Sequence, residues 1–122
     1  TGQPWLPVSV DHLRQAVASQ EQDPDGLLHH YRRAIAFRKM HPVLGKGAHD
    51  GVKSSGNIVY FTRNLDNVEM FCAVNRSEHV GEVHMPIGAW TFVGQELGGV
   101  QSANVGRVTL DAWQVCFAQR TT

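Results

Sequence analysis

The spacing of apolar residues divides the chain into a segment with a helical period and a longer part with a strand period. Five apolar residues between positions 24 and 41 project within an arc of about 120° when successive residues are placed 100° apart on a helix. They are Leu27, Leu28, Tyr31, Ala34 and Ile35. An apolar arc of this width is typical of a helix that packs one face on a protein core. From Gly45 onward apolar and polar residues alternate, which predicts short β-strands.

Charged residues and prolines predict where the helix begins and ends. Asp23 is a candidate N-cap, Pro24 suits the first helical position, and Asp25 places negative charge near the positive end of the helix dipole. Basic residues gather toward the other end, and Pro42 ends the helix because the residue before a proline disfavours the α conformation. The sequence therefore predicts a helix over residues 24–41.

Residues 1–24 carry a weaker pattern. Asp11 is a candidate cap for a short helix, but only Leu13, Ala16 and Val17 would share one side of it. Prolines and a polar stretch flank this possibility on both sides. We therefore predict that the segment is mostly loop.

The strand period predicts six short antiparallel strands. Residues 57–63 and 68–75 form two of them, joined by a hairpin turn at residues 64–67. Alternation in the second strand places Val68, Met70, Cys72 and Val74 on one face and Glu69, Phe71, Ala73 and Asn75 on the other. Further strands are expected at residues 81–85, 89–93, 107–110 and 114–118. The predicted fold is α+β and mostly β: an N-terminal loop and one long amphipathic helix, followed by a small antiparallel Greek-key-like β-sandwich or sheet.

Two side chains of the predicted helix do not fit a helix that packs on one core alone. Arg38 projects into the middle of the apolar arc, whereas Phe37 projects from the opposite side. This arrangement indicates a helix between two layers of protein. Arg38 then either bridges to an acid or to carbonyl groups of a neighbour, or extends along the arc to reach water.

Composition excludes several classes of partner. Eleven basic and eleven acidic residues give the 122-residue chain a formal charge of zero, so nothing favours nucleic acid. No window approaches the roughly 18 consecutive apolar residues of a membrane span. The only cysteines, Cys72 and Cys116, fall in apolar strand-like runs and are expected to be free thiols of a cytoplasmic protein, with a disulfide as the alternative.

The residues alone predict no catalytic, cofactor-binding or metal site. Seven histidines are present, but they form neither an HExxH motif nor a Cys/His ligand pattern. Asp23 and Asp25 are better explained by the start of a helix than by acid/base chemistry. The glycine pairs at residues 45–47 and 98–99 lack the strand, loop and helix setting of a phosphate site.

Three segments carry a resemblance to a known family. They are the loop Pro4-Trp5-Leu6-Pro7-Val8, the run from Asp23 to Arg38 containing Leu27-Leu28-His29-His30-Tyr31-Arg32-Arg33, and His41-Pro42-Val43-Leu44-Gly45-Lys46-Gly47. In this order they closely resemble the carboxyl-terminal stretch of α-glucosidases, including oligo-1,6-glucosidases, in glycoside hydrolase family 13. The later strands resemble the all-β domain C of that family. Gly26 stands where the family usually has serine.

The resemblance implies that residues 1–44 are the last loop and helix of a (β/α)₈ barrel and that residues 45–122 are the C-terminal β domain. Retaining hydrolysis in the family uses two carboxylates about 5–5.5 Å apart. Both come from earlier barrel strands, and no acid of this chain matches either of them. The parent protein is then expected to hydrolyse α-glucosidic bonds of oligosaccharides, whereas this fragment alone is inert and needs no cofactor.

The resemblance also assigns partners to particular residues. Trp5 lies in a loop on the catalytic face, where an indole is able to stack on a sugar, although a structural role is the preferred alternative. Leu27, Leu28, Tyr31, Ile35 and Arg38 would form the interface with the missing barrel. Without the barrel, the chain is expected to cover these residues by forming a homodimer or by folding the helix back onto its own sheet. Two other functions stay open: a non-catalytic relative such as a transporter heavy chain, and an independent β module that binds a sugar or another partner.

Overall fold

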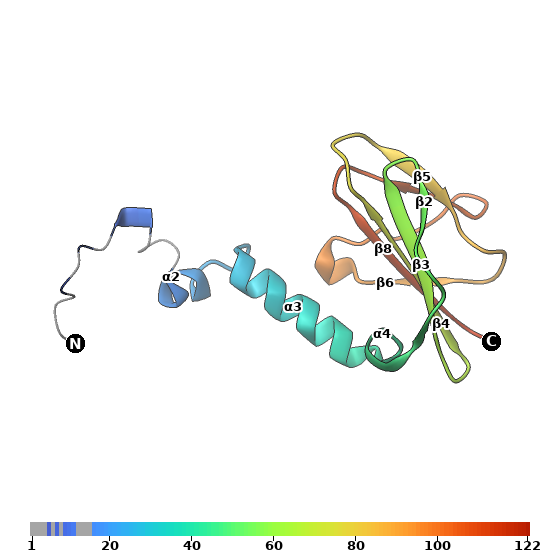
Figure 1. The fold of residues 1–122 in the computed structure, drawn as a ribbon, viewed down its shortest axis with the longest axis horizontal. Coiled ribbons are helices and arrows are strands. Elements are labelled where there is room, and N and C mark those ends of the chain that lie inside the picture. The colour runs from blue at the N-terminus through green and yellow to red at the C-terminus, as the bar shows by residue number, and fades with distance from the viewer. Residues whose placement is uncertain (1–4, 6, 8, 12–15) are drawn as a thin grey trace. The chain divides into compact units, whose positions relative to one another are not determined.

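A computed structural model of the 122-residue chain describes residues 5, 7, 9–11 and 16–122 (Figure 1). The chain divides into two compact units, residues 1–36 and residues 37–122. The first unit contains helix α2 (Val17–Glu21) and most of helix α3 (Leu27–Met40), and the second contains the end of α3 and all the strands. The predicted domain boundary after residue 44 is not tested by this division and stays a prediction.

Helix α3 is present but begins three residues later than predicted. Asp23 does not cap it: its carboxylate Oδ1 accepts a hydrogen bond from the backbone N–H of Asp25 at 3.1 Å, within a turn that precedes the helix. The sequence Asp23-Pro24-Asp25-Gly26 has turn chemistry, because proline presets φ and Asp accepts from the backbone two residues on. The carbonyl of Gly26 then accepts the N–H of His30 at 3.1 Å and starts the helical ladder.

The end of α3 follows the prediction closely. Arg38 and Lys39 lie in its last turn, and the helix stops at Met40, one residue before the predicted end. His41, with φ −121° and ψ 84°, separates it from a short helix, α4 (Pro42–Lys46), which was not predicted. Pro42 therefore ends one helix and also occupies the first turn of the next, where its missing N–H costs nothing.

The prediction that residues 1–24 are mostly loop is wrong for residues 17–21, which form α2. The alternative helix after Asp11 lies largely outside the described residues. Helix α2 has no buried residue, which agrees with its weak amphipathic pattern, and no side chain caps its N-terminus. Side chains of α3 contact the last residue of α2, Glu21. The ring nitrogen Nε2 of His29 forms a hydrogen bond with the Glu21 carbonyl oxygen at 2.7 Å, and Arg32 Nη2 donates to the side-chain oxygen Oε1 of Glu21 at 3.1 Å.

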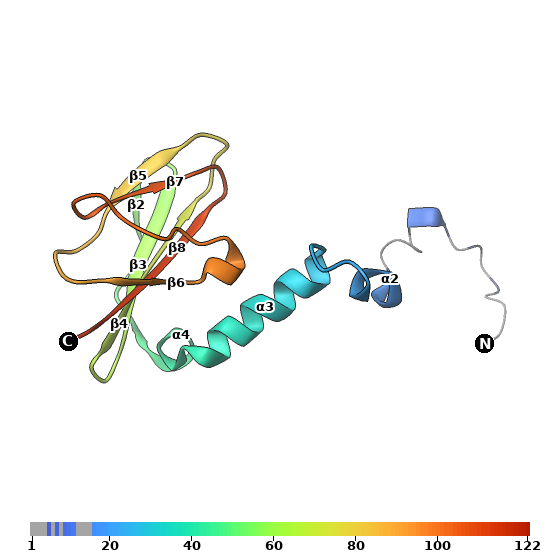
Figure 2. The ribbon, with the colours of Figure 1, turned by 180° about the vertical axis from the view of Figure 1, so that it is seen from behind.

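All strand pairs are antiparallel and form two sheets (Figure 2). The larger sheet has the order β1-β3-β4-β8-β6, with β2 paired to another part of β3. Its strands are β1 (Ala48–His49), β2 (Lys53–Ser55), β3 (Ile58–Leu65), β4 (Val68–Asn75), β6 (Thr91–Val93) and β8 (Val115–Thr121). The smaller sheet pairs β5 (Gly81–His84) with β7 (Arg107–Leu110). The mostly β fold is confirmed, and the very short β1 and β2 are the strands that the pattern did not predict.

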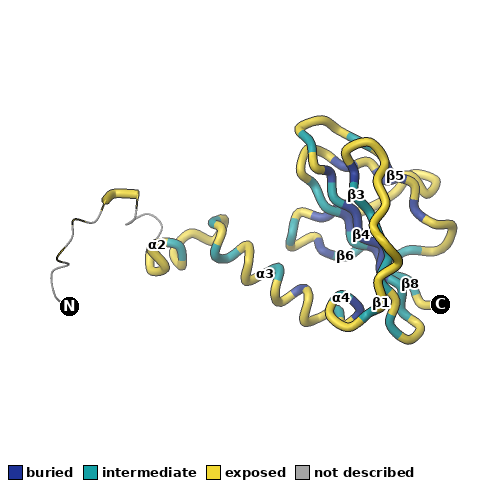
Figure 3. Tube along the Cα trace, in the orientation of Figure 1, coloured by how far each residue is buried: buried dark blue, intermediate teal, exposed yellow. Residues whose placement is uncertain are grey.

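Both faces of the larger sheet are covered, which places the most buried residues along β4 (Figure 3). Alternation along β4 is as predicted. Phe71 and Ala73 join the core between the two sheets, with Val83, Val108 and Leu110. On the other face Met70 and Cys72 pack with Val43 of α4 in a second cluster.

Candidate functional site

The predicted contact residues of the helix are mostly exposed. Leu27, Tyr31 and Ile35 are 64%, 60% and 54% exposed, and Leu28 is partly buried. The Arg38 side chain is exposed as well, and it forms no hydrogen bond or ion pair with any described residue. The apolar arc is therefore present on the helix, with Leu27, Tyr31 and Ile35 each more than half exposed.

Phe37 behaves differently from the arc, as its projection predicted. It is buried, with its ring centroid 4.8 Å from that of Phe117 on β8 and 4.5 Å from that of His41. The end of α3 is thus anchored on the β unit by one aromatic contact. Of the two sides of the helix that were predicted to pack on protein, the Phe37 side is confirmed.

Trp5, predicted to lie near a sugar, is 89% exposed. Most of its neighbours in the loop lie outside the described residues, so its role stays a prediction. An exposed indole is compatible with stacking on a sugar ring.

The two cysteines are buried free thiols, and the disulfide alternative is wrong. Cys72 pairs across the sheet with Phe117, and Cys116 pairs with Ala73, so the two side chains point to opposite faces. Burial is the main cause that raises the pKa of each thiol to about 12. A neutral, enclosed thiol is a poor nucleophile, which argues against a cysteine-based site.

The described residues contain no group of three or more His, Cys, Asp or Glu side chains placed to hold a metal ion. No described helix has the length and apolar character of a membrane span.

Among the described residues, the most enclosed ion pair joins Glu69 of β4 to Arg120 of β8, with Arg120 Nη2 3.2 Å from Glu69 Oε2. Arg120 also donates from Nη1 to the Ile87 carbonyl oxygen at 2.6 Å and lies over the Trp90 ring. The Glu69–Arg120 pair therefore holds the loop before β6 against the sheet and has a structural role.

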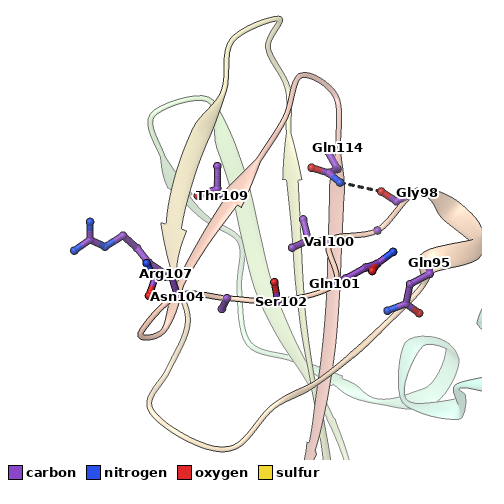
Figure 4. A pocket seen from close by; sticks show the side chains of 11 residues that line it. Gln95, Gly98, Val100, Gln101, Ser102, Asn104, Arg107, Thr109 and Gln114 are labelled. Carbon is purple, nitrogen blue, oxygen red and sulfur yellow. Dashed lines mark hydrogen bonds between the residues drawn. The ribbon is translucent and has the colours of Figure 1, made fainter.

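A polar cavity of about 530 Å³ lies on the β unit (Figure 4). Three segments line it: the loop around the 3₁₀ helix η1 (Gln95–Leu97), residues 98–104, and the facing parts of β7 and the turn before β8. Its lining residues are Gln95, Gly98, Gly99, Val100, Gln101, Ser102, Ala103, Asn104, Arg107, Thr109 and Gln114. They are mainly amides and hydroxyls, with one guanidinium and no carboxylate.

Backbone hydrogen bonds hold the walls of this cavity. Gly94 has a φ of 85°, and its carbonyl oxygen accepts the N–H of Leu97 at 2.9 Å and of Gly99 at 3.0 Å. A Cβ at Gly99 would stand 2.7 Å from the Gly94 oxygen, so the loop closes this tightly only with glycine there. The N–H of Val100 donates to the Val115 carbonyl and ties the loop to β8.

Gln114 joins two walls of the cavity. Its Nε2 donates to the Gly98 carbonyl oxygen at 3.1 Å, the bond drawn in Figure 4, and its Oε1 accepts the Asp111 N–H at 2.9 Å. At the other end, Asn104 and Arg107 exchange two backbone hydrogen bonds of 2.9 and 3.0 Å around a tight turn. The cavity is therefore built on ordered backbone.

No pattern in the sequence predicted this cavity. Its polar side chains come from η1, two loops and the start of β7, and they share no spacing that a helix or strand period would reveal. The available signal was compositional: residues 95–104 hold three amide side chains and a serine among glycines. The glycine pair at residues 98–99, which lacks the setting of a phosphate site, lies in a turn that forms one wall of the cavity.

Comparison with known proteins relates the whole chain to sugar-processing enzymes. No family model matches the chain. A probable α-glucosidase of Rhizobium meliloti (strain 1021) is 39% identical over 116 residues, which cover 95% of this chain and 21% of that protein. An oligo-1,6-glucosidase of Parageobacillus thermoglucosidasius is 29% identical over 86 residues, 70% of this chain and 15% of the relative. Homologues named α-glucosidase and oligo-1,6-glucosidase, together with solved structures of glycoside hydrolase family 13, therefore cover this chain.

Solved structures of family 13 share the fold. The α-glucosyl transfer enzyme XgtA matches 97% of this chain and 22% of its own, with a TM-score of 0.80 and 26% identity. The trehalulose synthase MutB from Pseudomonas mesoacidophila matches 98% of this chain and 22% of its own, with a TM-score of 0.74 and 22% identity, which shows the fold alone. The chain thus spans about a fifth of the length of the relatives it matches. Its β unit corresponds to the C-terminal β domain of the family.

Proposed function

We propose that this chain is the C-terminal region of a retaining α-glucosidase that hydrolyses α-glucosidic bonds in oligosaccharides. In this proposal residues 1–44 complete the catalytic barrel, residues 45–122 form the C-terminal β domain, and the two catalytic carboxylates belong to a preceding part of the parent chain. The chain contributes stability and shape rather than catalytic groups.

One observation carries the proposal: 95% of the chain aligns with a probable α-glucosidase at 39% identity, yet covers 21% of it. A (β/α)₈ barrel needs roughly 250 residues and carries its catalytic groups at the ends of several strands. A chain of 122 residues is too short to hold such a barrel together with a β domain. The exposed arc of α3 supports the barrel as the intended partner, because large apolar side chains are normally covered.

Other parts of the proposal have their own support. The exposed indole of Trp5 supports a sugar contact at the mouth of the parent active site. The two buried free thiols support a reducing compartment such as the cytoplasm.

Hydrolysis assays test the proposal. The 122-residue chain and a version extended to the length of its curated relatives are assayed with isomaltose, maltose and an aryl α-glucoside. We expect release of glucose by the extended protein and none above buffer by the 122-residue chain. Hydrolysis by the 122-residue chain, or an extended protein that folds but cleaves no α-glucoside, would contradict the proposal.

A matched pair of substitutions tests the role of the helix in the extended protein. Ile35→Glu alters the exposed arc, whereas Ala36→Glu adds the same charge to the same helix on the opposite side. We expect Ile35→Glu to lower the yield of folded enzyme and Ala36→Glu to leave it unchanged. Equal yields for the two variants would show that the arc has no partner in the parent protein.

A further inference from the structure

The polar cavity of the β unit has a lining that selects against most kinds of ligand. Zinc and other transition metals need imidazole, thiolate or carboxylate ligands, and protein sites for calcium or magnesium usually include carboxylates; the cavity offers none of these side chains. Phosphate groups call for several cations or a helix N-terminus, whereas the lining holds one arginine. That arginine, Arg107, lies 3.8 Å from Glu82 Oε2, so its charge is partly engaged. An apolar ligand would cover the amides without giving them hydrogen bonds, which is unfavourable.

A neutral molecule that both donates and accepts hydrogen bonds fits the lining. Each amide side chain offers a carbonyl acceptor and an NH₂ donor, and each hydroxyl offers both. The hydroxyl groups of a sugar have the same dual character. Val100, which is buried, adds an apolar patch to the floor that suits the C–H face of a sugar ring.

The side chains needed for such contacts are available. Gln101, Ser102, Asn104 and Thr109 form no side-chain hydrogen bond with any described residue. Gln95 uses its Nε2 on the Phe92 carbonyl oxygen at 3.2 Å and keeps its Oε1 free. In Figure 4 the side chains are spread from Gln95 and Gln101 at one end to Asn104 at the other, along a cleft rather than at a point.

Backbone hydrogen bonds of Val100 and of the Asn104–Arg107 turn hold the chain on both sides of residues 101–103. Binding therefore has to order only a short stretch, which limits its entropic cost. A volume of about 530 Å³ lies within the usual range for small-molecule sites.

We propose that the cavity lined by Gln95, Gln101, Ser102, Asn104, Thr109 and Gln114 binds short neutral oligosaccharides. The choice of α-linked glucosides as probes rests on the proposed function, whereas the neutral saccharide chemistry rests on the lining alone. An open cleft with a few neutral hydrogen bonds gives a Kd on the order of 1 mM. Such a site would hold a second part of a substrate chain near the enzyme.

Titration of the ¹⁵N-labelled 122-residue chain with isomaltose and maltose, followed by NMR, tests the site. We expect saturable shifts of the side-chain NH₂ signals of Gln95, Gln101, Asn104 and Gln114. Sorbitol, an acyclic polyol, and inorganic phosphate serve as probes of unspecific hydroxyl and anion binding, and we expect no saturable shift with either. The hydrolysis assay and this titration are able to fail independently, because binding here needs no catalytic group.

The double variant Gln101→Ala with Asn104→Ala is expected to raise the Kd about tenfold. Its matched control is Asn67→Ala with Gln119→Ala, which removes two amides beside a different cavity and should leave the Kd unchanged. The backbone spectrum of each variant reports whether the fold is intact. Absence of saturable shifts in the wild-type chain, equal response to phosphate or sorbitol, or an unchanged Kd in a folded Gln101→Ala/Asn104→Ala variant would each overturn the proposal.

Discussion

At the scale of single residues, the clearest conflict between side chain and backbone is at Val105. This residue has a φ of 51° and is 96% exposed, and Gly106 after it has a φ of 75°. Two consecutive positive φ values inside the bridge between Asn104 and Arg107 are the signature of a type I′ turn. Asn-Gly is the preferred pair there, whereas a β-branched residue is strained.

Val105→Asn is therefore expected to stabilise the chain by about 1 kcal/mol, because it relieves the strain and uncovers no packed surface. The corresponding rise in Tm is about 3–5 °C, measurable by circular dichroism or calorimetry. Val80→Asn is the control: Val80 is 65% exposed without a positive φ, and its replacement should change stability by less than about 0.5 kcal/mol. Equal effects of the two substitutions would show that Val105 carries no strain.

The buried thiols make a second residue-scale prediction. Each pKa is raised from 9.0 to about 12, so the folded chain keeps these protons where the unfolded chain loses them. Their contribution to stability is complete below about pH 9 and is lost as the pH rises toward 12. Each thiol lowers the free energy of unfolding by up to about 1.4 kcal/mol per pH unit in that interval.

Urea unfolding of wild type and of Cys72→Ala with Cys116→Ala, at pH 8 to 10.5, measures this effect. The variant is expected to be less stable at pH 8, since its smaller side chains leave cavities, but to lose stability more slowly as the pH rises. The two proteins differ only at the thiols, so the difference between their two curves reports the thiols. Parallel curves of stability against pH would contradict raised thiol pKa values.

At the scale of elements, Asn75 links β4 to the other sheet. Its side chain is buried, and Nδ2 lies 2.7 Å from the His79 carbonyl oxygen, 3.2 Å from that of Leu110 and 3.1 Å from that of Asp111. Its Oδ1 accepts the N–H of Ser77 at 3.1 Å. One amide thus satisfies the carbonyl groups at the end of β7 and the turn after β4.

Asn75→Asp replaces this donor by an oxygen that faces three carbonyl oxygens. We expect a loss of about 3–5 kcal/mol in the free energy of unfolding at pH 7, measured by urea titration. The loss should be smaller at pH 4, because a protonated carboxyl is able to donate one hydrogen bond. Asn67→Asp, at an exposed turn, is the control and should cost less than about 0.5 kcal/mol. Similar losses for the two variants would mean that the Asn75 amide does not link the sheets.

Elements with strong periodic patterns were predictable from the sequence, and those set by turn chemistry were less so. The long strands β3 and β4 and the two faces of β4 follow directly from alternation. The predicted start of α3 is three residues too early because Asp23 and Pro24 suit both a helix start and a turn. In the structure residues 23–26 form the turn, and the helix begins after Gly26. The polar cavity was beyond prediction, because chain segments that lie apart in sequence build it by tertiary packing.

At the scale of the whole molecule, the apolar arc of α3 decides how the 122-residue chain behaves alone. Leu27, Tyr31 and Ile35 are exposed, and covering a large apolar side chain is worth about 1.5–3 kcal/mol each. Phe37 lies outside this arc, and its contact with Phe117 fixes the end of the helix on the β unit. Without a barrel, a second copy of the chain is the available partner to cover these apolar side chains.

We therefore expect the isolated chain to form a dimer that dissociates on dilution, seen as a concentration-dependent elution volume in size-exclusion chromatography. Leu28→Glu and Ile35→Glu should each shift the chain toward the monomer, because a carboxylate in the contact would lose its hydration. Ala36→Glu adds the same charge outside the arc and should leave the elution profile unchanged. A wild-type chain that stays monomeric at all concentrations, or a dimer that tolerates Ile35→Glu as well as Ala36→Glu, would show that this surface does not mediate self-association.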